Sequence, residues 1–405
     1  MAINKEIQRN YYYSIDASFL LDKESKIINI TNLSIVNDYE NSFSPVAYIR
    51  AQLSEELYYT MINEKNRDKG RIVLNVQLYN PDTQVTSKYF KKTFLYEFPR
   101  KSLVKDRSNV EGSRDITKED STSYKQTYIG LIDIDSLNRN KMIINNLFVE
   151  SNIASITHYY LTQDIIREPF DNNPDFDIFY IPPMEGIPEL LKYINSRSSF
   201  YNTSFRYFDG YNCAYLLSNK GNPIEPNDNT YSTFHIRVSS ASSDPNKNTI
   251  TDGYMENRDQ KCYYIDVLDS VVQFDINTIQ DNLFNQIYAI DSEGNKEKIN
   301  MDINHIEASK TKPKFMRVFD NNFNYAKSQA NLFEIESSAI MITCYMINNV
   351  VLDPSREYIL EFPEDYKDKN GRYILTKKGE VYMQKGNNFV NTTTLYFKRV
   401  INKEK

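Results

Sequence analysis

Two aspartates, Asp133 and Asp135, have a spacing that could support catalysis. They fall in a predicted strand, Tyr128–Asp135, and residues two apart in a strand share one face. A pair of carboxylates on one face could hydrolyse a glycosidic bond. The sequence holds 54 acidic residues, however, so such pairs are expected by chance. We therefore interpret the two side chains as part of a solvated strand face.

A second acidic pattern imitates a calcium loop. Asp171, Asn173 and Asp175 match the first ligands of an EF-hand. The sixth position of that loop requires glycine and the twelfth requires glutamate, whereas this chain has Phe176 and Pro182 there. The pattern is interpreted as a turn that precedes a strand.

The residues that most often serve metals and nucleophilic catalysis are few and scattered. No H-E-x-x-H, C-x-x-C, G-x-S-x-G, G-x-G-x-x-G or Walker A pattern occurs. The three histidines are His158, His235 and His305, and the three cysteines, expected to be small buried side chains, are Cys213, Cys262 and Cys344. The sequence therefore predicts no enzyme, with no catalytic residue, no cofactor site and no metal site.

Composition narrows the class of protein. The chain has 405 residues, which suggests two or three domains, and its 40% hydrophobic content indicates a globular fold. The net charge of −6 argues against a dedicated nucleic-acid binder. A basic stretch at 88–107 is interpreted as the solvated side of two strands. The N-terminus lacks the apolar region of a signal peptide, and no run of apolar residues is long enough to suggest membrane insertion.

Residues 1–165 are predicted to form an antiparallel β domain with one or two helices. Strands are expected at 45–53, 70–80, 94–98, 128–135 and 142–149. Between the first two, Ser54 is expected to cap a helix that turns Leu57 and Met61 inward. Residues 106–126 have almost no apolar side chains, and we expect a long exposed loop that becomes ordered only against a partner.

Residues 166–225 are predicted to be a small α/β domain of strand, helix and hairpin. Four apolar residues follow the spacing of one buried helix face: Ile187, Leu190, Leu191 and Ile194. Phe205 and Tyr207 alternate with their neighbours in a strand, and Asp209-Gly210 is a turn signal. The aromatic side chains here could stack on sugars, but packing of the helix on the hairpin is the favoured interpretation.

Residues 226–405 are predicted to form a second β-rich domain, with a short helix at 279–287 and evenly spaced closing strands near 340–400. The whole chain is therefore expected to be mainly β, an α+β arrangement of two β domains with the small domain between or beside them.

Three segments resemble the tail-hub proteins of contractile-tailed bacteriophages. The first is the run FYIPPMEGIPELLKYINSRSSFYNTSFRYFDGYNCAYLLSNKG. The second is SFSPVAYIRAQLSEELYYTMI, and the third is the C-terminal VVLDPSREYILEFPEDYKDKNGRYILTKKGEVYMQKGNNFVNTTTLYFKR. The likeness of the first run rests on Pro182, Pro183, Leu190, Leu191, Tyr193, Ile194, Phe200, Tyr201, Phe208, Asp209 and Tyr215–Leu217.

The resemblance implies two antiparallel β-barrels akin to the tail-tube subunit, and a structural role in the virion baseplate. It implies a homotrimer that joins a sixfold tail tube to a threefold spike, with DNA passing through its lumen. The implied partners are the tail tube or tube-initiator proteins and the spike or cell-puncturing protein, with the tape-measure protein and baseplate wedge as further neighbours. Assembly would take place in the host cytoplasm.

Other functions remain open from the sequence. A tube initiator, tail terminator or neck protein would be a different structural component of the tail. A cell-wall hydrolase would require a catalytic pair such as Asp133 and Asp135. A glycan-binding tail protein would use the aromatic side chains near Asp209-Gly210.

Overall fold

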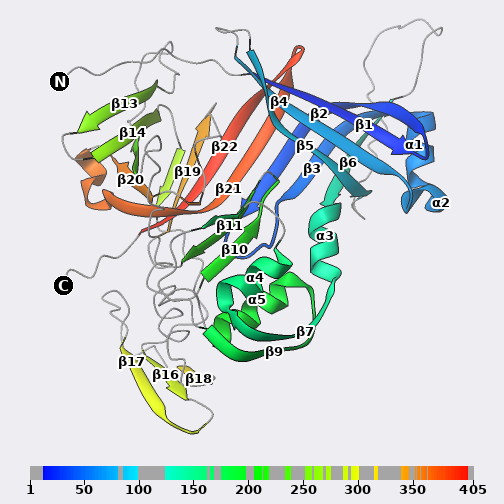
Figure 1. The fold of residues 1–405 in the computed structure, drawn as a ribbon. Coiled ribbons are helices and arrows are strands. Elements are labelled where there is room, and N and C mark those ends of the chain that lie inside the picture. Colours follow the sequence, from blue (N-terminus) through cyan, green and yellow to red (C-terminus); the bar gives the residue numbers. More distant parts are fainter. Residues whose placement is uncertain are drawn as a thin grey trace, which may run out of the picture.

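The computed structural model shows a mainly β protein with few helices (Figure 1). The structure describes residues 12–80, 85–98, 124–161, 165–167, 175–197, 205–211, 213–218, 233–238, 251–257, 260–267, 271–274, 286–290, 293–300, 314–317, 339–345, 352, 354–355, 357–362 and 364–399. The largest sheet has 14 strands and joins both ends of the described chain. This outcome confirms the predicted fold class.

The N-terminal part is a closed ring of six strands. They are β1 (Tyr12–Leu21), β2 (Glu24–Asp38), β3 (Val46–Ser54), β4 (Arg71–Asn80), β5 (Val85–Glu97) and β6 (Tyr124–Asp133). All neighbours are antiparallel in the order β1-β2-β3-β6-β5-β4, and β4 pairs again with β1. Alternate residues point into a shared apolar core, which explains the period-2 patterns in the sequence.

One end of this ring is covered by helix α1 (Glu55–Ile62), followed by the short α2 (Glu64–Arg67). The Ser54 side chain accepts a hydrogen bond from the Leu57 backbone N–H at 3.3 Å, which satisfies a donor at the helix start. Leu57 and Met61 are buried in the core, as predicted. Tyr96 then fixes the end of the helix, because its hydroxyl donates to the Met61 carbonyl at 2.8 Å.

A small α/β unit follows the ring, and Figure 1 places its helices beside the large sheet. Its elements are α3 (Ile134–Lys141), β7 (Ile143–Asn152), α4 (Ile153–Tyr160), β8 (Ile165–Arg167), β9 (Asp175–Glu185), α5 (Gly186–Arg197), β10 (Phe205–Asp209) and β11 (Ala214–Ser218). The predicted order of strand, helix and hairpin is present as β9, α5, β10 and β11. The predicted stripe on α5 is buried against Phe205 and Tyr207 of the hairpin, so core packing is confirmed there.

The C-terminal part supplies the remaining described strands. They are β12 (Thr233–Val238), β13 (Thr251–Asn257), β14 (Gln260–Val267), β15 (Val271–Phe274), β16 (Gln286–Ile290), β17 (Lys296–Asn300), β18 (Lys314–Arg317), β19 (Ala339–Tyr345), β20 (Glu357–Glu361), β21 (Gly371–Lys385) and β22 (Asn388–Arg399), with a 3-10 segment at Glu364–Lys369. The long strands β21 and β22 form a hairpin that also pairs with β2 and β1. In the described part of the chain the outer strands of this region form an open row, so the second barrel stays a prediction.

Several sequence-based expectations change or remain untested. Asp133 and Asp135 do not share a strand face, because β6 ends at Asp133 and Asp135 lies in the first turn of α3. Cys213 is half-buried rather than buried. Of the predicted loop at 106–126, residues 106–123 lie outside the described residues, and residues 124–126 belong to β6 instead of a loop. Most of the predicted helix at 279–287 also lies outside the described residues, and residues 286 and 287 are in β16. The domain boundaries stay a prediction; β7 and α4, which precede residue 165, share a core with β9 and α5.

Leu191 tests the packing of α5 on the hairpin. Its side chain is only 6% exposed, so Leu191→Ala removes buried methyl groups and leaves a cavity. We expect a loss of about 2–5 kcal/mol in the free energy of unfolding, measured by denaturant titration. The neighbouring Lys192→Ala is the control, because the Lys192 side chain is 74% exposed. Equal, small losses for both variants would contradict the packing.

Candidate functional site: a junction of buried charges

The tip of the β10–β11 hairpin is fastened to the rest of the molecule through Asp209, which is fully buried. Its carboxylate accepts hydrogen bonds from the Ser136 hydroxyl at 3.0 Å and from Arg139 Nε at 2.7 Å, both on α3. Its backbone N–H donates to the Phe43 carbonyl at 2.7 Å, in the turn after β2. One residue therefore joins three separate elements.

The turn after Asp209 requires glycine. A Cβ at Gly210 would lie 2.7 Å from the Cys213 backbone carbonyl, which is too close for any side chain. Burial raises the pKa of Asp209, and the guanidinium and hydroxyl of α3 act in the opposite direction. In the Asp209-Gly210 pair that predicted a turn, Gly210 thus permits the turn and Asp209 bonds it to α3 and to the turn after β2.

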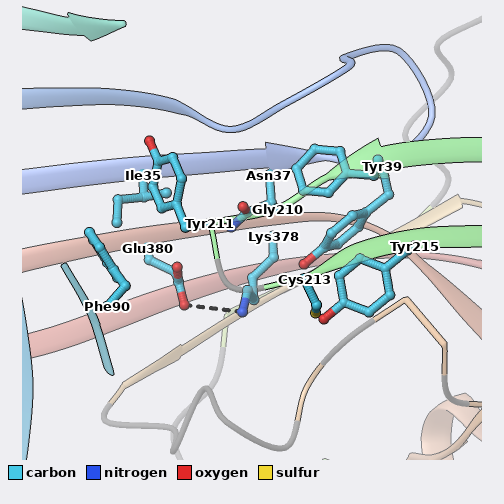
Figure 2. A pocket seen from close by; sticks show the side chains of 11 residues that line it. Ile35, Asn37, Tyr39, Phe90, Gly210, Tyr211, Cys213, Tyr215, Lys378 and Glu380 are labelled. Atoms are coloured by element: carbon cyan, nitrogen blue, oxygen red, sulfur yellow. Dashed lines mark ion pairs between the residues drawn. The ribbon is translucent and has the colours of Figure 1, made fainter. Parts of the chain in front are cut away.

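A pocket lies where this hairpin meets β2 and β21 (Figure 2). Its cavity volume is about 80 Å³, and Figure 2 shows Lys378 and Glu380 next to each other on β21, with an ion pair between them. Lys378 Nζ lies 3.2 Å from Glu380 Oε1 and donates to the Leu352 carbonyl at 3.3 Å. Both charged side chains are almost completely buried, so each depends on the other for compensation.

Tyr211 connects the pocket to the core of the ring. Its aromatic ring packs on Phe90 at a centroid distance of 5.0 Å and on Phe94 at 5.5 Å. Burial raises the pKa of Tyr211, and the carboxylates of Asp133 and Glu380 raise it further, so the phenol stays neutral at physiological pH. The hairpin tip therefore places a neutral aromatic side chain against the core of the ring.

A third ion pair closes the other side of the junction. Lys398 of β22 lies 2.5 Å from Glu40, which follows β2. The Asp209–Arg139 pair joins β10 to α3, the Lys378–Glu380 pair lies within β21, and the Lys398–Glu40 pair joins β22 to the turn after β2. Such an arrangement holds elements in fixed positions. The buried charged side chains of the junction are already paired with one another, and Cys213 adds a half-buried thiol to the pocket.

Asp133 and Asp135, the candidate catalytic pair of the sequence analysis, have structural partners. Lys92 Nζ contacts the carboxylates of Asp133 at 3.1 Å and Asp135 at 3.4 Å. Asp133 also caps α3, since its side chain accepts from the Asp135 backbone N–H at 3.0 Å. The two aspartates are thus a helix cap and an ion pair.

The candidate metal ligands are not brought together where the structure describes them. His158 is exposed on α4 and His235 lies in β12, while His305 is outside the described residues. Asp175 begins β9, and Asp171 and Asn173 are also outside the described residues. Among the described residues there is no group of three or more histidine, cysteine or acidic side chains arranged to hold a metal ion.

Sequence reasoning missed the residues that form the junction. Lys378 and Glu380 stand in TKKGEVY, a pattern equally typical of a solvated strand. Arg139 and Ser136 lie on α3, in a stretch between two predicted strands for which no element was predicted. The sequence signal that did locate the site was the Asp209-Gly210 turn.

A model of one protein family, described as Bacteriophage PBS1 gene 109 protein, matches residues 3–400. The chain belongs to this family. The residues that match the PBS1 gene 109 family model include the ring, the small α/β unit and the C-terminal strands. Comparison with curated protein sequences gave no match.

Solved structures of tail proteins are similar to this family member. The tail protein from Neisseria meningitidis MC58 is similar with a TM-score of 0.53 and 10% identity, over 96% of this chain and 97% of that chain. The 43 kDa tail protein of prophage MuSo2 from Shewanella oneidensis has a TM-score of 0.49 and 8% identity, over 94% and 96% of the two chains. By family, the chain is a bacteriophage protein, and it shares its fold with a tail protein along nearly its whole length, which agrees with the resemblance to tail proteins found in the sequence.

The helices that the structure describes are short. In the part of the chain that the structure describes, none is long and apolar enough to cross a membrane.

The ion pair in the pocket gives a test of the junction. Lys378→Ala leaves the Glu380 carboxylate buried without its cation, and we expect a loss of about 3–5 kcal/mol in the free energy of unfolding. Replacing both residues together, as Lys378→Met with Glu380→Leu, removes the uncompensated charge and is expected to recover most of that loss. Denaturant titration measures both. A single variant as stable as the original protein would contradict the coupling.

Proposed function

We propose that this protein is the central hub of a bacteriophage baseplate, where it joins the tail tube to the spike. The observation that carries the proposal is the family match over nearly the whole chain, together with a fold shared with a tail protein along 96% of the sequence. The three segments that resemble tail hubs are spread over the same length. The proposal therefore concerns the whole chain and not one grafted domain.

The junction supports a structural role. A tail component must transmit force between its neighbours without coming apart, which favours continuous sheets and cross-linked elements. Here the ring and the C-terminal strands share a 14-stranded sheet, and the Lys398–Glu40 ion pair joins β22 to the turn after β2. The small unit is bonded to the same turn, because the Asp209 backbone N–H donates to the Phe43 carbonyl. The paired carboxylates that could have supported hydrolysis are occupied by Lys92 and by the start of α3.

In this proposal the chain is a homotrimer in a contractile-tailed virion. Its partners are tube or tube-initiator proteins on one side and a spike or cell-puncturing protein on the other, with the tape-measure protein and baseplate wedge nearby. DNA passes through the lumen without specific binding, which a net charge of −6 permits. The particle is assembled in the host cytoplasm. Two tube-like barrels in each of three chains would present six similar elements to a sixfold tube.

A different tail component is the second candidate function. A tube initiator, terminator or neck protein could use the same fold, and the similarity to a tail protein from Neisseria meningitidis MC58 favours the tail without fixing a position in it. The number of copies per particle distinguishes the two candidates, because a protein that builds or terminates a sixfold tube is expected in a multiple of six copies.

We therefore predict three copies of this chain per particle. Quantitative mass spectrometry of purified particles, with isotope-labelled peptides as internal standards, measures the ratio of this chain to the tube and spike proteins. The expected ratio to a trimeric spike chain is one to one, because both would share the threefold axis. A count of six or twelve per particle would contradict the hub and favour a tube-associated component.

A further inference from the structure

Glu380 has a carboxylate oxygen that lacks a hydrogen-bond donor from the surrounding strands. The side chain is only 2% exposed, and Lys378 Nζ lies 3.2 Å from Oε1 and supplies a compensating charge. Within the described residues, however, no donor forms a hydrogen bond with this oxygen. An ion pair removed from bulk water is favourable only when further hydrogen bonds satisfy its remaining lone pairs. The pair on β21 therefore requires a donor from another source.

The side chains directly beside Glu380 do not provide that donor. Ile35 of β2 lies opposite Glu380 in the antiparallel register, and its side chain is apolar. Thr393 of β22 lies opposite Glu380 on the other side, and its hydroxyl donates to Asn391 Oδ1 at 2.8 Å. The donor must therefore approach from the face of the sheet that carries the pocket.

The pocket at the hairpin is small, and much of its lining is polar. Glu380 and Lys378 line it together with Asn37, and the hairpin contributes Cys213 and Tyr215 (Figure 2). A carboxylate, an ammonium, an amide, a thiol and a phenol thus border one space. A water molecule requires about 10–15 Å³ of space for its centre, and the pocket has a volume of about 80 Å³. It has room for more than one water molecule.

The charges in the lining disfavour other small ligands. An anion would be repelled by the Glu380 carboxylate, and a metal cation would be repelled by the Lys378 ammonium. An apolar molecule would leave the buried Glu380 oxygen without a donor, which is costly. Water is neutral, small, and able both to donate and to accept hydrogen bonds. It is the ligand whose chemistry agrees with all of these side chains.

We propose that ordered water occupies this pocket and donates a hydrogen bond to Glu380 Oε1. A hydrogen bond mediated by water is nearly as favourable in enthalpy as a direct one, so the buried ion pair is satisfied by protein and solvent together. The hairpin then contacts the sheet in two ways. Tyr211 packs on Phe90 and Phe94, and the pocket beside them is bridged by water. The inference concerns this pocket alone and is independent of the position of the chain in a tail.

Filling the pocket tests the energetic consequence. Cys213→Leu places a larger apolar side chain in the lining and displaces the water, so the buried Glu380 oxygen loses its donor. We expect the equilibrium constant for unfolding, measured by denaturant titration, to rise about tenfold or more.

The matched background is the variant Lys378→Met with Glu380→Leu, whose pocket has no buried charge to hydrate. In that background Cys213→Leu displaces no required water, and we expect no comparable rise in the equilibrium constant. Any other contact that the Cys213 side chain makes is lost in both backgrounds, so its effect cancels in the comparison. An equal rise in both backgrounds would overturn the proposal.

A crystal structure of the full chain, at a resolution that shows ordered water, locates the ligand directly. We expect density for a water molecule within hydrogen-bonding distance of Glu380 Oε1, and we expect the Cys213→Leu variant to lack it. Three results would overturn the proposal: no density beside this oxygen, a protein donor bonded to it, or a charged ligand in the pocket.

Discussion

The pairing of β21 with β2 is the contact on which the rest of the structure depends. It runs antiparallel from Asn32 to Asp38 and joins strands separated by more than three hundred residues in sequence. Tyr382 of β21 enters the core of the N-terminal ring, where its aromatic ring meets Tyr13 edge to face at 4.8 Å. Together with the shorter pairing of β22 with β1, the β21–β2 pairing joins the C-terminal strands and the ring into one sheet.

The buried charges follow from that pairing. Once β21 lies beside β2, its other residues face the hairpin tip at 209–213, and Lys378 and Glu380 lose contact with bulk water. Lys378 and Glu380 stand two residues apart on β21, so this pair compensates buried charge within one strand and does not join two elements. Asp209 and Arg139 lie on different elements, β10 and α3, and a buried pair of this kind disfavours any arrangement that separates them. The Asp209 bonds and the Lys398–Glu40 pair therefore hold the small unit and β22 against the turn after β2.

The sequence predicted what is determined locally. The cap at Ser54, the alternation along β4 and the stripe that buries Leu191 all depend on neighbouring residues, and all three were found. The prediction that Asp133 and Asp135 share a strand was wrong. A strand that ends at an aspartate helix cap has the same composition as a longer strand, so the sequence did not distinguish the two. Burial of Lys378 could not be predicted, since it depends on β2 and on a hairpin tip far away in the chain.

A continuous sheet that connects both ends of the described chain suits a component that lies between a tube and a spike. The central claim is the position of this protein in the particle. Electron cryomicroscopy of intact tails, reconstructed without imposed symmetry, tests it most directly. The account predicts a ring of three copies on the tail axis, between the last tube ring and the spike. Density for this chain away from the axis, or in a sixfold ring, would contradict it.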